Sequence, residues 1–396
     1  MRDHLFCTAC RREFPIDSAF PRCDGCNEPL EVSISRAKSS IKTDAPRLLE
    51  RFRDFMPLAS LHAGINLGEG NTPLVKSSAA ARETGIDRLY FKNEALNPTW
   101  SFKDRGTIAC IEHALNLGYE RIGTVSTGNM AASVAAYGAR AGLQTYILVG
   151  SNLPEEKIAP IAIYSPRLIL VDGDYGDLYF RSLEIGKQRG VYFMNSDVPF
   201  RVEGSKTIAF EICEQMGFEV PDNLVVPVSS GGNFRGIIKG FEEFLEAGLI
   251  DGLPRFIAAQ ADGCSPIADA FENNREAVER IVKPNTIAKA IANPYPPSGN
   301  QVLRKLRQHG GIAMTVSDAE IESAQELLAR DGIFGQPAAA APLAAVRKLV
   351  SQGTISGTQS VACVVSGAGV KSMSHLAAKE YQGTRIAIEK LQDVFR

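Results

Sequence analysis

The sequence has neither a strong net charge nor a long apolar run. Its 43 basic and 45 acidic side chains leave a formal net charge of −2 at pH 7, so no nucleic acid or other polyanion is expected as a partner. No stretch of about 18 apolar residues occurs, so no segment is expected to span a membrane. The N-terminus also lacks the apolar core of a secretion signal, which predicts a cytoplasmic protein.

The cysteine pattern does not indicate a disulfide framework. Four of the eight cysteines are scattered in mostly apolar surroundings and are expected to be buried thiols: Cys110, Cys213, Cys264 and Cys363. What the chain does have is length and apolar content, with 396 residues, 44% of them hydrophobic and 22% charged. These values are typical of a globular protein with two or more domains and an ample core.

The other four cysteines form two close pairs near the N-terminus. Two residues separate Cys7 from Cys10, and two separate Cys23 from Cys26. Two such knuckles on a short hairpin can place four thiolates tetrahedrally around one ion, and a closed site of four sulfur ligands favours structural Zn²⁺. Two disulfides, free thiols or an iron ion are the alternatives. We expect a zinc-ribbon-like module with four cysteine ligands over residues 1–35.

The rest of the chain alternates apolar strand-like segments with helical patterns. This alternation is typical of α/β folds in which helices flank parallel sheets, and ligands bind there beyond the carboxyl ends of the strands. The predicted strands are Arg121–Val125, Gln144–Val149, Arg167–Val171, Val191–Met194, Asn223–Val228, Arg255–Ala259 and Ser360–Val365. The predicted helices include Thr107–Leu117, Ala131–Arg140, Thr207–Met216, Asp318–Arg330 and the alanine-rich Ala338–Ala345.

One lysine lies where a loop leads into a helix. Pro98 and Thr99 break the local structure, and Lys103 follows shortly before the helical pattern begins. The positive end of a helix dipole disfavours a charged amine, and a lysine with a lowered pKa can form a Schiff base with a carbonyl. The alternative is an ordinary solvated lysine at the start of a helix.

The motif around this lysine favours the reactive interpretation. Ser101-Phe102-Lys103-Asp104-Arg105-Gly106 resembles the cofactor-lysine motif of the threonine synthases, which are enzymes that use pyridoxal 5′-phosphate (PLP). Gly68-Glu69-Gly70-Asn71-Thr72-Pro73-Leu74 resembles their upstream motif, and several of these enzymes carry a comparable ribbon.

The resemblance covers nearly the whole chain and implies the two-domain fold of the tryptophan-synthase β-subunit, fold type II. It places a linker and the first part of a large domain in residues 36–103. A small α/β domain would follow in 104–204, and the rest of the large PLP-binding domain in 205–396.

Two loops match the family's loops around the cofactor ring. In the first, the resemblance implies that Asn129 contacts the ring hydroxyl, and that Ser126, Thr127 and the N–H of Gly128 bind the substrate carboxylate. In the second, Ser366 ends the last predicted strand and would meet the pyridine nitrogen. Without the family, the two loops would be an ordinary helix cap and a tight turn.

A third loop matches the cup that holds the phosphate of PLP. Its glycines allow backbone N–H groups to converge on an anion at a helix N-terminus, although a glycine turn alone is a weak signal. The resemblance assigns to the cofactor site, together with Lys103 and its neighbour Phe102, the residues Ser229, Ser230, Gly231, Gly232 and Asn233.

A fourth segment corresponds to the place where the family binds the phosphate of its substrate. The resemblance implies this role for Asn195, Ser196 and Arg201, and a guanidinium can bind a phosphate with two parallel hydrogen bonds. Without the family, a solvated loop with a surface arginine would be the simpler interpretation. Nearby Lys206 is expected to be structural.

Four positions depart from the family pattern. Trp100, the only tryptophan, replaces a glycine, and Met130 follows Asn129 where threonine is typical. Gln336 replaces a glutamate, and Ala368 replaces a histidine. Because all four would lie beside the cofactor or the substrate, they indicate either compensated changes within one activity or a changed substrate or reaction.

The resemblance implies a PLP-dependent lyase that converts O-phospho-L-homoserine and water to L-threonine and phosphate, acting as a homodimer. The enzymatic alternative is a related β- or γ-replacement or elimination on another activated amino acid, such as O-phosphoserine. A further alternative is a regulatory protein that retains the fold without turnover.

Overall fold

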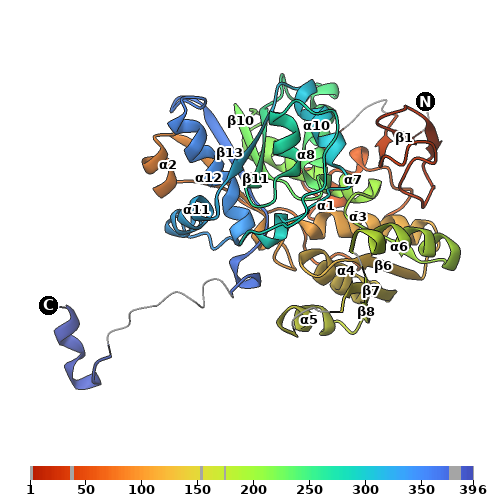
Figure 1. The fold of residues 1–396 in the computed structure, drawn as a ribbon, viewed down its shortest axis with the longest axis horizontal. Coiled ribbons are helices and arrows are strands. Elements are labelled where there is room, and N and C mark those ends of the chain that lie inside the picture. Colours follow the sequence, from red (N-terminus) through yellow and green to blue (C-terminus); the bar gives the residue numbers. More distant parts are fainter. Residues whose placement is uncertain (1–2, 36–39, 152–154, 174, 374–384, 396) are drawn as a thin grey trace.

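The computed structural model describes residues 3–35, 40–151, 155–173, 175–373 and 385–395, and it contains three sheets (Figure 1). The strands are β1 His4–Cys7, β2 Glu13–Pro15, β3 Leu30–Ser33, β4 Leu74–Lys76, β5 Arg88–Asn93, β6 Arg121–Val125, β7 Gln144–Gly150, β8 Arg167–Val171, β9 Tyr192–Phe193, β10 Asn223–Pro227, β11 Arg255–Ala261, β12 Ile312–Val316 and β13 Ser360–Val365.

Helices connect most of these strands. The α-helices are α1 Leu48–Arg51, α2 Ala79–Thr84, α3 Lys103–Asn116, α4 Asn129–Arg140, α5 Glu155–Ala162, α6 Tyr175–Arg189, α7 Pro199–Gln215, α8 Gly232–Glu246, α9 Pro266–Glu272, α10 Gly299–Gln308, α11 Asp318–Arg330 and α12 Pro337–Ser351. Short 3₁₀ helices are η1 Arg53–Phe55, η2 Glu94–Leu96, η3 Lys289–Ile291, η4 Gly369–Lys371 and η5 Ile388–Phe395. Within the described residues, every helix is too short or too polar to cross a bilayer.

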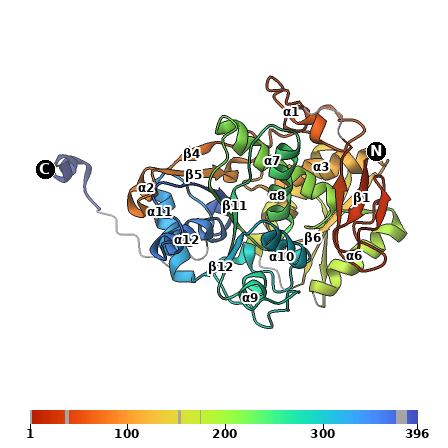
Figure 2. The ribbon, with the colours of Figure 1, turned by 90° about the horizontal axis from the view of Figure 1, so that it is seen from above.

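The largest sheet has six strands in the order β12-β11-β10-β13-β5-β4, all parallel except β4. Alternate residues of its central strand β10 pack on opposite faces. Leu224 and Val226 join the core under α8, while Val225 joins the core under α11 and α12. Figure 2 shows α7 and α8 on one side of this sheet and α11 and α12 on the other. Helices therefore cover both faces, as expected for buried parallel strands.

The second sheet has four parallel strands in the order β8-β7-β6-β9 and lies wholly within residues 121–193. Packed helices connect it to the large sheet, because α4 contacts α3, α3 contacts α7, and α7 contacts α8. The third sheet is the small antiparallel β2-β1-β3 sheet at the N-terminus, whose strand β3 packs on α7. It lies at the edge of the molecule in Figure 1.

Several predicted elements agree with the structure, and others need correction. The strands β6, β8 and β13 and the helix α11 have the predicted bounds. However, α3 begins at Lys103 rather than Thr107, and α7 begins at Pro199 rather than Thr207. Proline suits the first turn of a helix, because a backbone N–H at that position would have no acceptor within the helix. Strand β9 is shorter than the predicted Val191–Met194.

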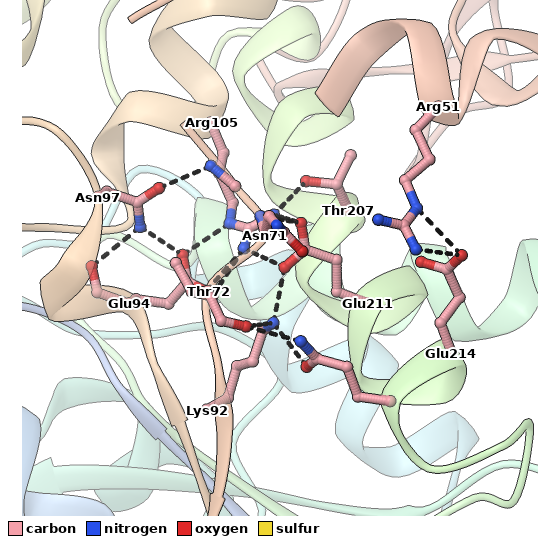
Figure 3. A network of polar contacts seen from close by, with 12 residues as sticks. Arg51, Asn71, Thr72, Lys92, Glu94, Asn97, Arg105, Thr207, Glu211 and Glu214 are labelled. Carbon is pink, nitrogen blue, oxygen red and sulfur yellow. Dashed lines mark hydrogen bonds and ion pairs between the residues drawn. The ribbon is translucent and has the colours of Figure 1, made fainter. Parts of the chain in front are cut away.

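A buried network of charges joins α3 and α7 to the large sheet (Figure 3). The guanidinium of Arg105 donates to Glu94 from Nε (2.6 Å) and to Glu211 from Nη2 (2.6 Å), and all three side chains are buried. Lys92 Nζ donates to the same Glu211 Oε2 at 2.6 Å. Burial alone would raise the pKa of Glu211, but the two cations lower it to about 2. The two positive charges of Arg105 and Lys92 are thus neutralised inside the protein by the two carboxylates of Glu94 and Glu211.

Replacing Glu211→Gln should destabilise the fold strongly. The change leaves two buried cations with one carboxylate, and breaking a buried ion pair costs about 3–5 kcal/mol. We expect a loss of this size in the free energy of unfolding measured with denaturant. The matched control is Glu50→Gln, which breaks a half-exposed pair with Arg47 and should cost less than about 1 kcal/mol. Equal losses in the two variants would contradict the network's role.

Candidate active site

Lys103 begins α3 and is partly buried. Its pKa is lowered to about 7, first by burial and then by the positive charge of Arg201. Its Nζ lies 4.3 Å from the centre of the Phe102 ring. Near neutral pH much of this amine is therefore uncharged, which is the form that acts as a nucleophile or a base.

The turn before Lys103 is held by short polar contacts. Asp104 accepts hydrogen bonds from the N–H of Thr99 (2.7 Å), from its hydroxyl (2.5 Å) and from the hydroxyl of Ser133 on α4 (2.6 Å). Trp100 has a left-handed backbone, with φ of 62°, and its side chain is half exposed. Glycine adopts this conformation without strain, so tryptophan at this position must be held by its surroundings.

Three segments far apart in the sequence meet at this turn. The N–H of Phe102 donates to the carbonyl of Ser366 (3.1 Å), at the carboxyl end of β13. The N–H of Ala368 donates to the carbonyl of Trp100 (3.0 Å), and the N–H of Gln336 donates to that of Gly367 (3.0 Å). The predicted residues Lys103, Phe102 and Ser366 are thus brought together at the carboxyl end of the central strand β13 of the large sheet.

Asn129, the first residue of α4, reaches the same place. Its Nδ2 donates to Oε1 of the buried Gln336 at 3.3 Å. The preceding loop of Ser126, Thr127 and Gly128 follows strand β6, and Gly128 is exposed. Trp100, Gln336 and Ala368 therefore meet at one place, and Met130 follows Asn129 there in the sequence. The contact between Asn129 and Gln336 was not predicted, and the departure from glutamate at 336 was its only signal.

The glycine-rich segment from Ser229 to Asn233 follows β10 and includes the first two residues of α8, and β10 pairs with β13 in the sheet. Gly231 has φ of 93°, which turns the chain into the helix. Both polar side-chain atoms of Asn233 are buried without a hydrogen-bond partner in the described structure, and so is the hydroxyl of neighbouring Ser298. Unsatisfied donors at a helix N-terminus suit an anion. The cup therefore fits the phosphate of PLP, and Lys103, with its pKa lowered to about 7, fits its aldehyde. Ser298 has no sequence signal that could have identified it.

The segment from Asn195 to Arg201 is buried and partly helical, not a solvated loop. The Asn195 side chain accepts from the N–H of Val125 (3.0 Å) and donates to Ser182 (3.0 Å). The Arg201 guanidinium donates to the carbonyl of Met194 (2.8 Å) and to Thr107 (3.2 Å), and burial lowers its pKa. Both side chains thus hold the structure together, while Ser196 is partly exposed. Lys206 is buried between Glu203 and Glu243, as its expected structural role requires.

The sulfurs of Cys7, Cys10, Cys23 and Cys26 lie within 4.8 Å of one another. Cys7 and Cys26 are 3.4 Å apart, and Cys10 and Cys23 are 3.6 Å apart. These distances exceed the S–S bond of about 2.05 Å, so the four thiols are not paired as disulfides. Their arrangement suits a tetrahedral metal ion.

Comparison with known proteins agrees with this geometry. Residues 65–367 match the family model "Pyridoxal-phosphate dependent enzyme". A threonine synthase of Methanocaldococcus jannaschii is 38% identical over 92% of each chain. One of Methanosarcina acetivorans is 36% identical, over 92% of this chain and 91% of its own.

Solved structures support the fold. The processed form of threonine deaminase isoform 2 from Solanum lycopersicum superposes with a TM-score of 0.66, covering 78% of this chain and 88% of its own at 20% identity. At that identity the likeness supports the fold type II architecture alone. Because the family match and both relatives span most of the chain, it belongs to the pyridoxal-phosphate dependent enzymes, in the branch that contains the threonine synthases.

Proposed function

We propose that this enzyme converts O-phospho-L-homoserine and water to L-threonine and phosphate. The observation that carries the proposal is the partly buried Lys103, whose pKa is lowered to about 7, in a turn where the N–H of its neighbour Phe102 donates to the carbonyl of Ser366. It stands in a chain whose relatives at 36–38% identity are threonine synthases. When bound, PLP draws electrons from the substrate's α-carbon and so allows a remote group to leave.

Lys103 supplies the proton transfers of this reaction. With a pKa of about 7, its amine can take a proton from the substrate's α-carbon and return one to carbon at neutral pH. We assign the cofactor ring to Asn129, Phe102 and Ser366, its phosphate to the segment Ser229–Asn233, and the substrate carboxylate to Ser126, Thr127 and Gly128.

The segment of Asn195, Ser196 and Arg201 is proposed to receive the substrate's phosphate. The buried positive charge of Arg201 supports this role, since it favours an anion nearby. Its hydrogen bonds to backbone carbonyls indicate that it acts by charge and by holding the loop more than by a two-point contact. The two α/β domains and the homodimer remain predictions of the family resemblance, and the cytoplasmic location remains a prediction from the N-terminal sequence.

A second candidate is elimination or replacement on O-phosphoserine. The convergence of Trp100, Gln336 and Ala368 at the lysine turn favours it, because changes beside a cofactor alter the space left for the substrate. The two substrates differ by one methylene, which changes where the phosphate lies relative to Lys103.

The substrate test separates the two candidates. The PLP-loaded enzyme is incubated with O-phosphohomoserine and, separately, with O-phosphoserine, and phosphate release and the amino-acid product are measured. We expect phosphate and threonine from the first substrate only. Lys103→Ala should lower this rate by about three orders of magnitude or more, because it removes the proton-transfer group. The control Lys289→Ala alters an exposed lysine and should keep full activity.

Release from phosphoserine alone would identify the second candidate. No release from either substrate by a protein that visibly binds PLP would contradict both.

We propose Zn²⁺ as the ion of the four-cysteine cluster, because four close thiolates with no open position suit it. The purified protein should contain one zinc per chain by elemental analysis. Cys10→Ser removes one of the four ligands and should lower the zinc content severalfold, whereas Cys264→Ser, outside the cluster, should retain it. Iron in place of zinc, or no metal, would contradict the assignment.

A further inference from the structure

The N-terminal ribbon, residues 3–35, contacts elements that pack with each of the two larger sheets. On one side, Gln301 of α10 donates to the carbonyl of Pro29 (2.7 Å), and Arg304 pairs with Glu28 (2.8 Å). On the other side, Phe20 packs against the apolar cluster of β6, β7 and α6. The ribbon is therefore attached to the body of the enzyme and is not a freely appended module.

Arg22 connects the second cysteine knuckle to this body. It precedes Cys23, and its Nε donates to the carbonyl of Asn27 (2.8 Å), the residue after Cys26. Its Nη1 pairs with Oδ2 of Asp197, and both side chains are buried. A buried pair of this kind is costly to break, because the remaining charge loses its partner.

Asp197 is also held from the opposite side. Its carbonyl accepts from Arg235 Nη2 of α8 at 2.8 Å. Nη1 of the same guanidinium lies 3.6 Å from Oε2 of Glu31 on ribbon strand β3. A chain of contacts therefore runs from Glu31 to Arg235, from Arg235 to the backbone carbonyl of Asp197, and from the Asp197 carboxylate to Arg22, and it begins and ends in the ribbon.

The backbone of Ser196 and Asp197 packs directly against the segment that we assign to the cofactor's phosphate. A Cβ placed on Gly232 would lie 2.3 Å from the carbonyl oxygen of Ser196, the residue before Asp197. The two backbones are thus in direct contact. Since Gly232 is the first residue of α8, a shift of Asp197 must move Ser196 and disturb the N–H groups of the cup.

We infer that Arg22 is a positioning residue for the cofactor site, and that metal binding in the ribbon tightens PLP binding through the pair of Arg22 with Asp197. The ion orders the knuckle of Cys23 and Cys26, the knuckle fixes Arg22, and Arg22 holds the Ser196–Asp197 backbone against α8. This inference rests on the proposed function only in taking the segment from Ser229 to Asn233 as the phosphate cup.

The test is a titration of the apoenzyme with PLP in the absence of substrate, in which binding is monitored by the visible absorbance of the bound cofactor. Arg22→Met keeps an unbranched apolar stem but removes the charge, and it should weaken PLP binding by roughly tenfold, part of the cost of a broken buried pair. Arg22→Lys should restore part of the affinity. The matched control is Arg12→Met, which alters a ribbon arginine whose pair with Asp24 is exposed, and should bind PLP as the wild type does.

Metal removal provides a second, independent perturbation. The wild type stripped with a chelator should lose PLP affinity to about the same degree as Arg22→Met, and stripping the variant should add little, since both changes act through one contact. Elemental analysis verifies that the unstripped variant keeps its metal. If Arg22→Met does not fold, the stripped wild type decides the question.

The inference would be overturned by unchanged PLP affinity in the metal-loaded Arg22→Met variant or in the stripped wild type. It would also be overturned if stripping the variant reduced its PLP affinity by as much as stripping reduces that of the wild type. A wild type that binds PLP but does not release phosphate from phosphohomoserine would overturn the proposed substrate and leave this inference standing. A wild type that takes up no PLP would overturn both.

Discussion

The buried guanidinium of Arg105 is the constraint on which the cofactor lysine depends. It lies two residues after Lys103 and connects α3 to Glu94, the first residue of η2 directly after β5, and to Glu211 on α7. Because a buried charge cannot be left unpaired, these elements have little freedom to move apart. The hydroxyl of Thr72, in the upstream Gly-Glu-Gly-Asn-Thr motif, donates to Glu94 and belongs to the same network. The motif is therefore connected to the helix that begins at Lys103 through Glu94 and Arg105.

Sequence periodicity identified the central elements of the fold more completely than its edges. The buried strands β10 and β13 and the helix α11 are long, regular and apolar in the expected pattern. The strands β4, β5 and β12 were not among those predicted. The first is a three-residue edge strand, β5 contains the buried Lys92, and most of β12 is only partly buried. Such strands depend on tertiary partners, which periodicity does not record.

In the candidate site, too, local sequence patterns predicted some features, and others depend on tertiary contacts. The lowered pKa of Lys103 was predicted from a helix dipole, but burial and the charge of Arg201 cause it. The segment from Asn195 to Arg201 could be assigned only by family resemblance, because its burial depends on α3 and on the ribbon. The pair of Arg22 with Asp197 spans 175 residues, and no local pattern indicates it. Contacts of this kind require the folded chain.

The account depends most directly on Lys103 being the residue that holds the cofactor. The test is borohydride reduction of the PLP-loaded protein, followed by digestion and peptide mass spectrometry. The account predicts a single phosphopyridoxyl group, located on the peptide that contains Lys103. Other buried or partly buried lysines, such as Lys92 and Lys371, are engaged by hydrogen bonds and should remain unmodified. A label on another lysine, or no label on a protein that binds PLP, would contradict the account.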